Sequence, residues 1–295
     1  MSILNLTSDG LPNILVVVYS TLATSRKAWR RDELIAHIAP EQVVEDSKLA
    51  RTTVNRWIEL GLLKLEPDTE LLSLAEEPDV PLDSEHGVVK AVRMAARRVA
   101  LSQVNNGDLW AKEESRAADL SRSVAWLLAQ DVYRTGSQSL FSVANAQIAG
   151  TGAVIVQNEA RATGLKVWAH FLGFVRHAGN LDIDPTVAIT DVLDQCIARG
   201  AEMPAKDFVI ALAHVLPVLD GGVYRRAVEL RLRAGALPVL QPDQLSMSLS
   251  RALMCLRVNK TLQLSNRADV GSSIVLTGRN GLLSDQRFTW VRRAE

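Results

Sequence analysis

The sequence contains little cysteine. Cys196 and Cys255 are the only two in 295 residues, and each lies in an apolar, helix-like context. A disulfide framework needs more, so the pattern favours buried thiols in a reducing, cytoplasmic setting. No basic segment followed by an apolar run and a cleavage site opens the sequence, and no window approaches about 18 uncharged apolar residues. We therefore expect neither an export signal nor a transmembrane helix, and no membrane partner.

The sequence also lacks an excess of either charge, because 33 basic residues balance 33 acidic ones. A neutral chain is unlike proteins that coat nucleic acid through bulk charge, so any DNA contact must come from local basic faces. Its length allows two or three domains, and 47% hydrophobic residues suffice for their cores.

Catalytic motifs are missing as well. We find no Ser/His/Asp arrangement by motif, and the pair Gly221-Gly222 lacks the lysine and spacing of a phosphate loop. His170 and His177 are seven residues apart without an evident third metal ligand. We therefore predict a protein that is not an enzyme and that carries no cofactor or metal.

The most informative stretch runs from Asp46 to Leu65 and reads as a helix that turns directly into a strand. Asp46 or Ser47 can cap its start, because a short side-chain oxygen accepts a backbone N–H there. Gly61 suits the left-handed position that ends a helix. One half of this helix is mainly apolar and is predicted to face a core: Leu49, Ala50, Thr53, Val54, Trp57, Ile58 and Leu60.

The other half of the same helix is polar and contains Glu59 beside five donor-rich side chains. Arginine and asparagine can fork onto base edges in a major groove, while lysine and threonine can hold phosphates. We predict a DNA-binding face made of Lys48, Arg51, Thr52, Asn55 and Arg56. An ordinary solvated helix surface explains the pattern equally well.

The neighbouring segments predict a winged helix-turn-helix over residues 11–75. Two further helices are expected at Pro12–Thr24 and Arg31–Ala39, and the latter stops before a proline. After the third helix, alternating leucines on both sides of a Pro-Asp turn predict a small hairpin, the wing. Many winged helices bind proteins, and this wing is acidic, with Glu66, Asp68 and Glu70 followed by Glu76, Glu77 and Asp79. Carboxylates repel phosphates, so the wing favours a protein partner.

A second basic face is expected on a long helix over Val88–Val104, opened by Gly87. Lys90, Arg93 and Arg97 lie opposite its apolar side with Arg98 beside them, and they suit a nucleic-acid backbone or an acidic partner. The competing interpretation is a solvated helix whose arginines pair with the acidic wing or with Glu113 and Glu114.

The C-terminal part repeats the helix-to-strand pattern. Val54, Trp57, Leu63 and Leu65 align without a gap with Leu253, Leu256, Leu262 and Leu264. We therefore predict a second winged-helix-like module at about Leu237–Arg293, whose outer helix face suits protein interaction better than base edges. The predicted fold is mainly α: a winged helix-turn-helix at 1–80, a helical middle at 81–236 and the second module at 237–295.

Four stretches together resemble one family, and they lie at residues 2–13, 168–174, 216–225 and 249–253. This is the DpdG family of accessory proteins, found in bacterial gene clusters that put 7-deazaguanine bases into DNA and restrict unmodified DNA. The resemblance implies a cytoplasmic component of an anti-phage restriction system. It would work beside helicases, an ATPase and a nuclease-like subunit, and it supplies no catalytic residues.

Three functions compete on these grounds. The basic helix faces favour a subunit that binds or senses double-stranded DNA. The acidic wing and zero net charge favour an adaptor whose winged helices dock on a partner ATPase or helicase. A winged-helix transcription regulator is the third.

Overall fold

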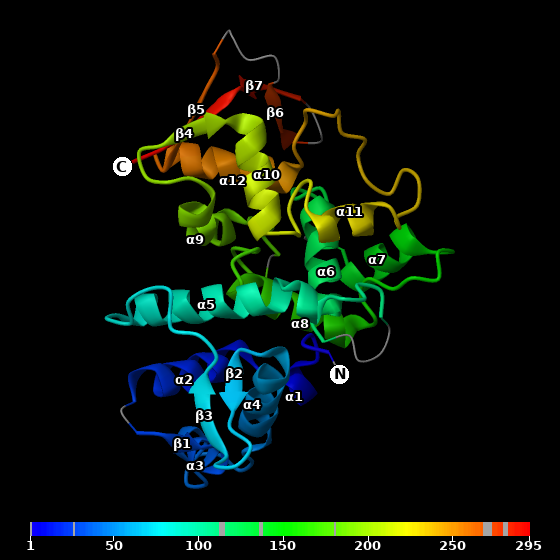
Figure 1. Cartoon of the computed structure of the whole chain (residues 1–295). Coiled ribbons are helices and arrows are strands. Elements are labelled where there is room, and N and C mark those ends of the chain that lie inside the picture. The colour runs from blue at the N-terminus through cyan, green and yellow to red at the C-terminus, as the bar shows by residue number, and fades with distance from the viewer. Residues whose placement is uncertain are drawn as a thin grey trace. The chain divides into compact units, whose positions relative to one another are not determined.

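The computed structural model is mainly helical, as the sequence predicts, and carries small antiparallel sheets (Figure 1). It describes residues 2–25, 27–111, 116–135, 138–179, 181–267, 273–279 and 283–295. The chain forms two compact units, Met1–Leu120 and Ser121–Glu295. The sequence instead predicted three regions divided near residues 80 and 236.

The first unit contains the expected helices and hairpin, together with one short strand that the sequence did not predict. Its elements are α1 (Leu6–Asp9), α2 (Pro12–Thr24), β1 (Trp29–Arg30), α3 (Arg31–Ile38), α4 (Lys48–Leu60), β2 (Leu63–Leu65), β3 (Leu71–Leu74), α5 (Glu85–Leu101) and the 3₁₀ turn η1 (Gln103–Asn105). The strands form an antiparallel sheet in the order β1-β3-β2, with Trp29 opposite Leu72 and Leu63 opposite Leu74.

Helix α4 has both of its predicted ends. The Lys48 N–H donates to Asp46 Oδ1 at 2.7 Å, which satisfies one of the unpaired donors of the first turn. Gly61 ends the helix with φ 87° and ψ 20°, the left-handed conformation that glycine adopts without steric cost. Trp57 is fully buried on the predicted inner half, and α4 packs against α2 and β2.

Helix α5 belongs to the first unit because it packs on α2. It begins at Glu85, where Ser84 Oγ accepts the Gly87 N–H at 3.1 Å. The predicted start at Gly87 was therefore late: Gly87 lies in the first turn, where a Cβ would meet the Pro81 carbonyl oxygen at 2.6 Å. An N-terminal domain ending near residue 80 leaves out this packing partner.

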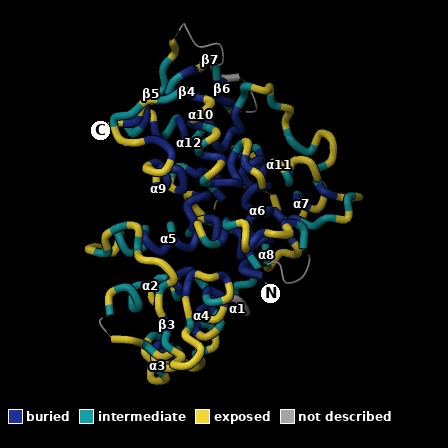
Figure 2. The backbone as a smooth tube through the Cα atoms, viewed as in Figure 1, coloured by how far each residue is buried: buried dark blue, intermediate teal, exposed yellow. Residues whose placement is uncertain are grey.

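The second unit is built around buried helices and a second three-stranded sheet. Its helices are α6 (Ala118–Ala129, which spans the division), α7 (Leu140–Ile148), α8 (Glu159–Phe171), α9 (Thr186–Cys196), α10 (Ala205–Val215), α11 (Val223–Glu229) and α12 (Met247–Val258). Its strands are β4 (Glu202–Pro204), β5 (Leu262–Ser265), β6 (Ile274–Thr277), β7 (Leu283–Phe288) and β8 (Trp290–Arg293). Figure 2 shows α6 buried along its length, and Trp126 and Trp168 are fully buried core residues.

The second unit repeats part of the element order of the first, with α11 inserted between α10 and α12 and two strands between β5 and β8. β4 leads directly into α10 as β1 leads into α3, and α12 leads into β5 as α4 leads into β2. The strand orders also correspond, β4-β8-β5 matching β1-β3-β2. The strands predicted after α12 are present. They and α12 also contact elements that precede the predicted start near Leu237, because β4 supplies an outer strand and α9 packs on α12.

The connection between β5 and β8 contains a two-stranded hairpin, β6–β7, that packs its first strand on α12. All four residues of β6 are buried. The turn predicted at Gly278–Gly281 falls partly on residues 280–282, outside the described part of the chain.

Candidate nucleic-acid interface

Four of the five DNA-binding residues predicted on α4 lie along one side of the helix, called here the outer stripe: Lys48, Arg51, Thr52 and Asn55. Lys48, Arg51 and Asn55 are exposed and Thr52 is half-buried, and their spacing of three to four residues aligns them along the helix. The Thr52 hydroxyl donates to the Leu49 carbonyl oxygen at 3.2 Å, so it bonds its own helix. The stripe therefore presents two cations and one amide.

Arg51 forms an ion pair with Asp32 of α3, with 2.9 Å between Nη1 and Oδ1. Both side chains are largely exposed, 48% and 66%, so water screens the pair and it contributes little stability. A phosphate can displace such a partner at small cost.

The prediction that Arg56 lies on the outer face of α4 was wrong, because its side chain is buried. Its side chain is only 1% exposed and bonds Glu59 at 2.9 Å. Two neighbours in its helix row, Thr53 and Leu60, are also buried. The segment after α5 covers this end of α4, because Asn105 Nδ2 donates to the Leu60 carbonyl oxygen at 2.8 Å. Arg56 thus belongs to the interior and has no place in a base-reading face.

The predicted basic face of α5 is also smaller than expected. Arg97 is 2% exposed, since the next residues of its row, Ala100 and Leu101, face the core. Lys90 and Arg93 are half-buried. The assignment of Arg97 to an outward face was therefore wrong.

Arg98, the exposed arginine of α5, is held by carboxylates of the acidic segment that follows β3. Its guanidinium lies 2.6 Å from Glu76 and 2.6 Å from Asp79. The sequence offered this pairing as the alternative to nucleic-acid binding. Two carboxylates on one guanidinium leave little attraction for a phosphate.

The hairpin β2–β3 presents its acidic side chains to solvent. Glu66, Asp68 and Glu70 are exposed at and near its tip. Carboxylates at this place repel a DNA backbone, as expected from the sequence.

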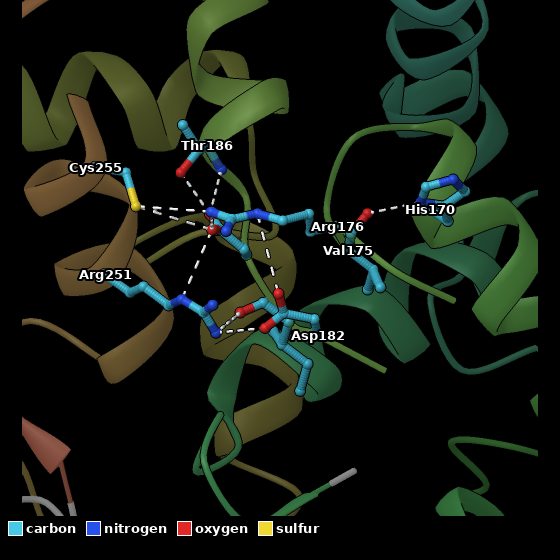
Figure 3. A network of polar contacts seen from close by, with 9 residues as sticks. His170, Val175, Arg176, Asp182, Thr186, Arg251 and Cys255 are labelled. Carbon is cyan, nitrogen blue, oxygen red and sulfur yellow. Dashed lines mark hydrogen bonds and ion pairs between the residues drawn. The ribbon is translucent and has the colours of Figure 1, made fainter. Parts of the chain in front are cut away.

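In the second unit, the outer face of α12 is occupied by a polar network (Figure 3). Arg251 Nη1 lies 2.6 Å from Asp182, and Arg176 bonds the buried carboxylate of Asp184. Asp184 also accepts the Thr186 N–H at 3.0 Å. The network fastens the connection between α8 and α9 to α12, so Arg251 is engaged within the fold.

Cys255 lies beside this network, with its Sγ 3.7 Å from Arg176 Nη2. These residues border a cavity of about 700 Å³ that Met254 and Val258 also line. Figure 3 also shows His170, one of the two histidines considered as metal ligands from the sequence. Its Nδ1 lies 3.0 Å from the Val175 carbonyl oxygen. The described residues contain no group of three or more side chains arranged to hold a metal ion.

A second group of exposed cations, not expected from the sequence, lies at the junction of α12, β5 and β8. Arg257, Lys260 and Arg292 are exposed there and border a cavity of about 520 Å³. One signal was present: in the gapless alignment of the two helix-to-strand patterns, Lys260 falls on Gly61.

Within the described ranges, no helix is long and apolar enough to cross a bilayer. No curated protein and no solved structure matches the chain. A family model described as DpdG-like matches residues 1–270. Because this match spans nearly the whole sequence, it confirms the resemblance predicted from the four stretches, and the chain belongs to the DpdG-like family.

Proposed function

We propose that this protein is a non-catalytic, cytoplasmic, DNA-contacting subunit of the anti-phage restriction system to which the resemblance points. In this role, its first unit is a winged helix-turn-helix that places α4 against duplex DNA. Partner subunits, an ATPase, a helicase or a nuclease, carry out the chemistry.

The element order supports the winged-helix assignment. Three helices are followed by a hairpin, and β1 joins this hairpin from the loop before the second of the three helices. In this topology α4 corresponds to the recognition helix, whose outer face enters the major groove.

The outer stripe of α4 is the observation that carries the proposal. Lys48 and Asn55 are exposed and form no ion pair or hydrogen bond through their side chains with another described residue, and Arg51 has a screened partner. Lysine and arginine suit phosphates, and asparagine suits adenine edges. Because few cations contribute, we expect weak binding by the isolated protein, about 10⁻⁴–10⁻⁶ M at physiological salt.

Titration of a labelled duplex by the full chain at several salt concentrations tests this proposal. Lys48→Ala/Arg51→Ala should flatten the log–log salt dependence by about 1.8, because each phosphate that the protein no longer neutralises reduces the slope by about 0.9. The matched control, Lys27→Ala/Lys64→Ala, removes two exposed cations of the same unit outside α4 and should bind as wild type does. Equal binding by wild type and Lys48→Ala/Arg51→Ala contradicts a DNA contact through α4.

A protein-docking adaptor is the second candidate, and the acidic hairpin favours it. Glu66, Asp68 and Glu70 are exposed and suit a basic surface of a partner subunit. The variant Glu66→Gln/Asp68→Asn/Glu70→Gln should lose co-purification with the partner ATPase or helicase if the hairpin docks there. Retained co-purification in this variant argues against docking through the hairpin.

A further inference from the structure

The second unit contains a concave basic surface where α12 ends and β5 begins, called here the basic cleft. It surrounds a cavity of about 520 Å³, whose lining includes Arg257, Lys260, Gln263, Arg292, Arg293 and Glu295. Three of these side chains are exposed cations that come from different places: the last turn of α12, the turn after it, and β8.

The lining of the basic cleft contains more cationic than acidic side chains. Arg293 is buried and engaged, with Nη1 2.7 Å from Asp194, so it belongs to the interior. Lys260 and Arg292 form no ion pair with a described residue. Glu295 is the one acidic side chain in the lining. The cleft therefore attracts anions.

A strand carboxylate beside the cleft, Glu202, is bound by a neighbouring arginine that does not line the cleft. Arg292 is paired across the sheet with Glu202 of β4 on one side and Gln263 of β5 on the other. Arg267 binds Glu202 at 2.6 Å and stacks on the Trp290 ring at 4.1 Å. Arg267 thus holds the Glu202 carboxylate by an ion pair, whereas Arg292 acts on it only at longer range and has Gln263 as its cross-strand neighbour on the other side.

Lys260 has an unusual backbone conformation. It has φ +59°, in the left-handed region that costs free energy for residues with a Cβ. Gly61 has the corresponding position in the first unit, with φ +87°.

The hydrogen bonds of the two turns are the same. Leu62 N–H donates to the Trp57 carbonyl oxygen at 2.9 Å, as Thr261 N–H does to that of Leu256. At the left-handed position, the turn of the first unit therefore has a glycine and the turn of the second unit has a lysine side chain. Strained residues cluster at functional sites, which directs attention to this side chain.

We propose that the basic cleft binds the phosphodiester backbone of duplex DNA, an inference that rests on the proposed role of the chain at DNA. Lys260 and Arg292 contact phosphates, and the Gln263 amide donates to a phosphate oxygen. Cations from separate elements suit a polyanion better than one small phosphate. Because the network of Arg251 with Asp182 occupies the outer face of α12, the contact reads the backbone and is independent of base sequence.

The test is fluorescence anisotropy of a labelled duplex titrated with the full chain at several salt concentrations. Lys260→Ala/Arg292→Ala should flatten the log–log salt dependence by about 1.8 and weaken binding equally for unrelated duplex sequences. The control Lys206→Ala/Arg226→Ala removes two exposed cations of α10 and α11 that do not line the cleft, and it should bind as wild type does.

Lys260→Gly separates binding from folding. Glycine adopts the left-handed conformation without the Cβ penalty, so this variant should melt no lower than wild type and still bind DNA more weakly. A variant that is as stable as wild type and has unchanged DNA affinity and salt dependence overturns the proposal.

The same titrations distinguish failure of the cleft proposal from failure of the proposed DNA contact through α4. If Lys48→Ala/Arg51→Ala loses affinity while Lys260→Ala/Arg292→Ala does not, the cleft is refuted and the α4 contact stands. The opposite result supports the cleft and refutes the α4 contact. Absence of any binding by wild type at low salt overturns both.

Discussion

Truncation of Trp57 tests the assignment of the inner half of α4. The side chain is fully buried in the middle of the helix, on the half that the sequence predicts to face the core. α4 packs against α2 and β2, so Trp57→Ala removes an indole from the centre of the first unit. The outer stripe lies on the other half and is not altered directly.

The expected cost follows from the volume removed. Truncating a buried tryptophan to alanine costs about 3–5 kcal/mol, because apolar burial decreases and a cavity remains. Domains are stable by about 5–15 kcal/mol in total, so this decrease is a large share. For a unit of this size, each kcal/mol lowers Tm by about 4 °C, which gives a decrease of about 12–20 °C.

Thermal unfolding followed by circular dichroism and calorimetry measures the effect. Trp57→Phe keeps most of the volume and should be destabilised less. Val104→Ala is the surface control, because Val104 is 80% exposed and its truncation should cost less than about 0.5 kcal/mol. A melting temperature for Trp57→Ala equal to that of Val104→Ala would refute the packing of α4 described here.

Two further predictions concern thiol reactivity and the paired arginine of α5. Burial raises the pKa of the Cys196 thiol to about 11, although nearby Arg293 partly opposes the shift. At pH 8 about one Cys196 in a thousand is therefore a thiolate, so iodoacetamide followed by mass spectrometry should label Cys255 in the native protein and Cys196 after unfolding. Arg98→Ala should lower stability by less than about 1 kcal/mol and leave the salt dependence of DNA binding unchanged, because two carboxylates already neutralise this side chain; a flatter salt slope in this variant would show that Arg98 contacts phosphate.

Local sequence determined the helix-to-strand elements of both units. In the first unit, Asp46 accepts the first N–H of α4, Gly61 ends the helix, and the 3.6-residue period places Trp57 inside. These features depend on residues within one or two turns, so a sequence read locally contains them. The alternating leucines likewise predicted β2 and β3, because side chains in a strand alternate between its faces.

Local sequence patterns could not predict the pairing between strands that are far apart in the chain. β1 and β4 are two and three residues long, too short for a periodic signal, and each is defined by a partner far along the chain. Trp29 pairs with Leu72, and Met203 pairs with Val291. The second pairing joins β4 to the C-terminal strands, and a boundary predicted near residue 236 from local sequence does not include this contact.

Whether an individual arginine side chain is buried or exposed was also decided by the tertiary structure. A helical wheel separates two halves but does not say how wide a strip other segments will cover, and Asn105 reaches the end of α4 from 45 residues away. Arg56 and Arg97 were both predicted on outer helix faces and are buried, while Arg51 stays at the surface. The sequence by itself determined which residues share a helix face. Only the folded chain determined which of those faces meet water, because burial depends on contacts between segments far apart in sequence.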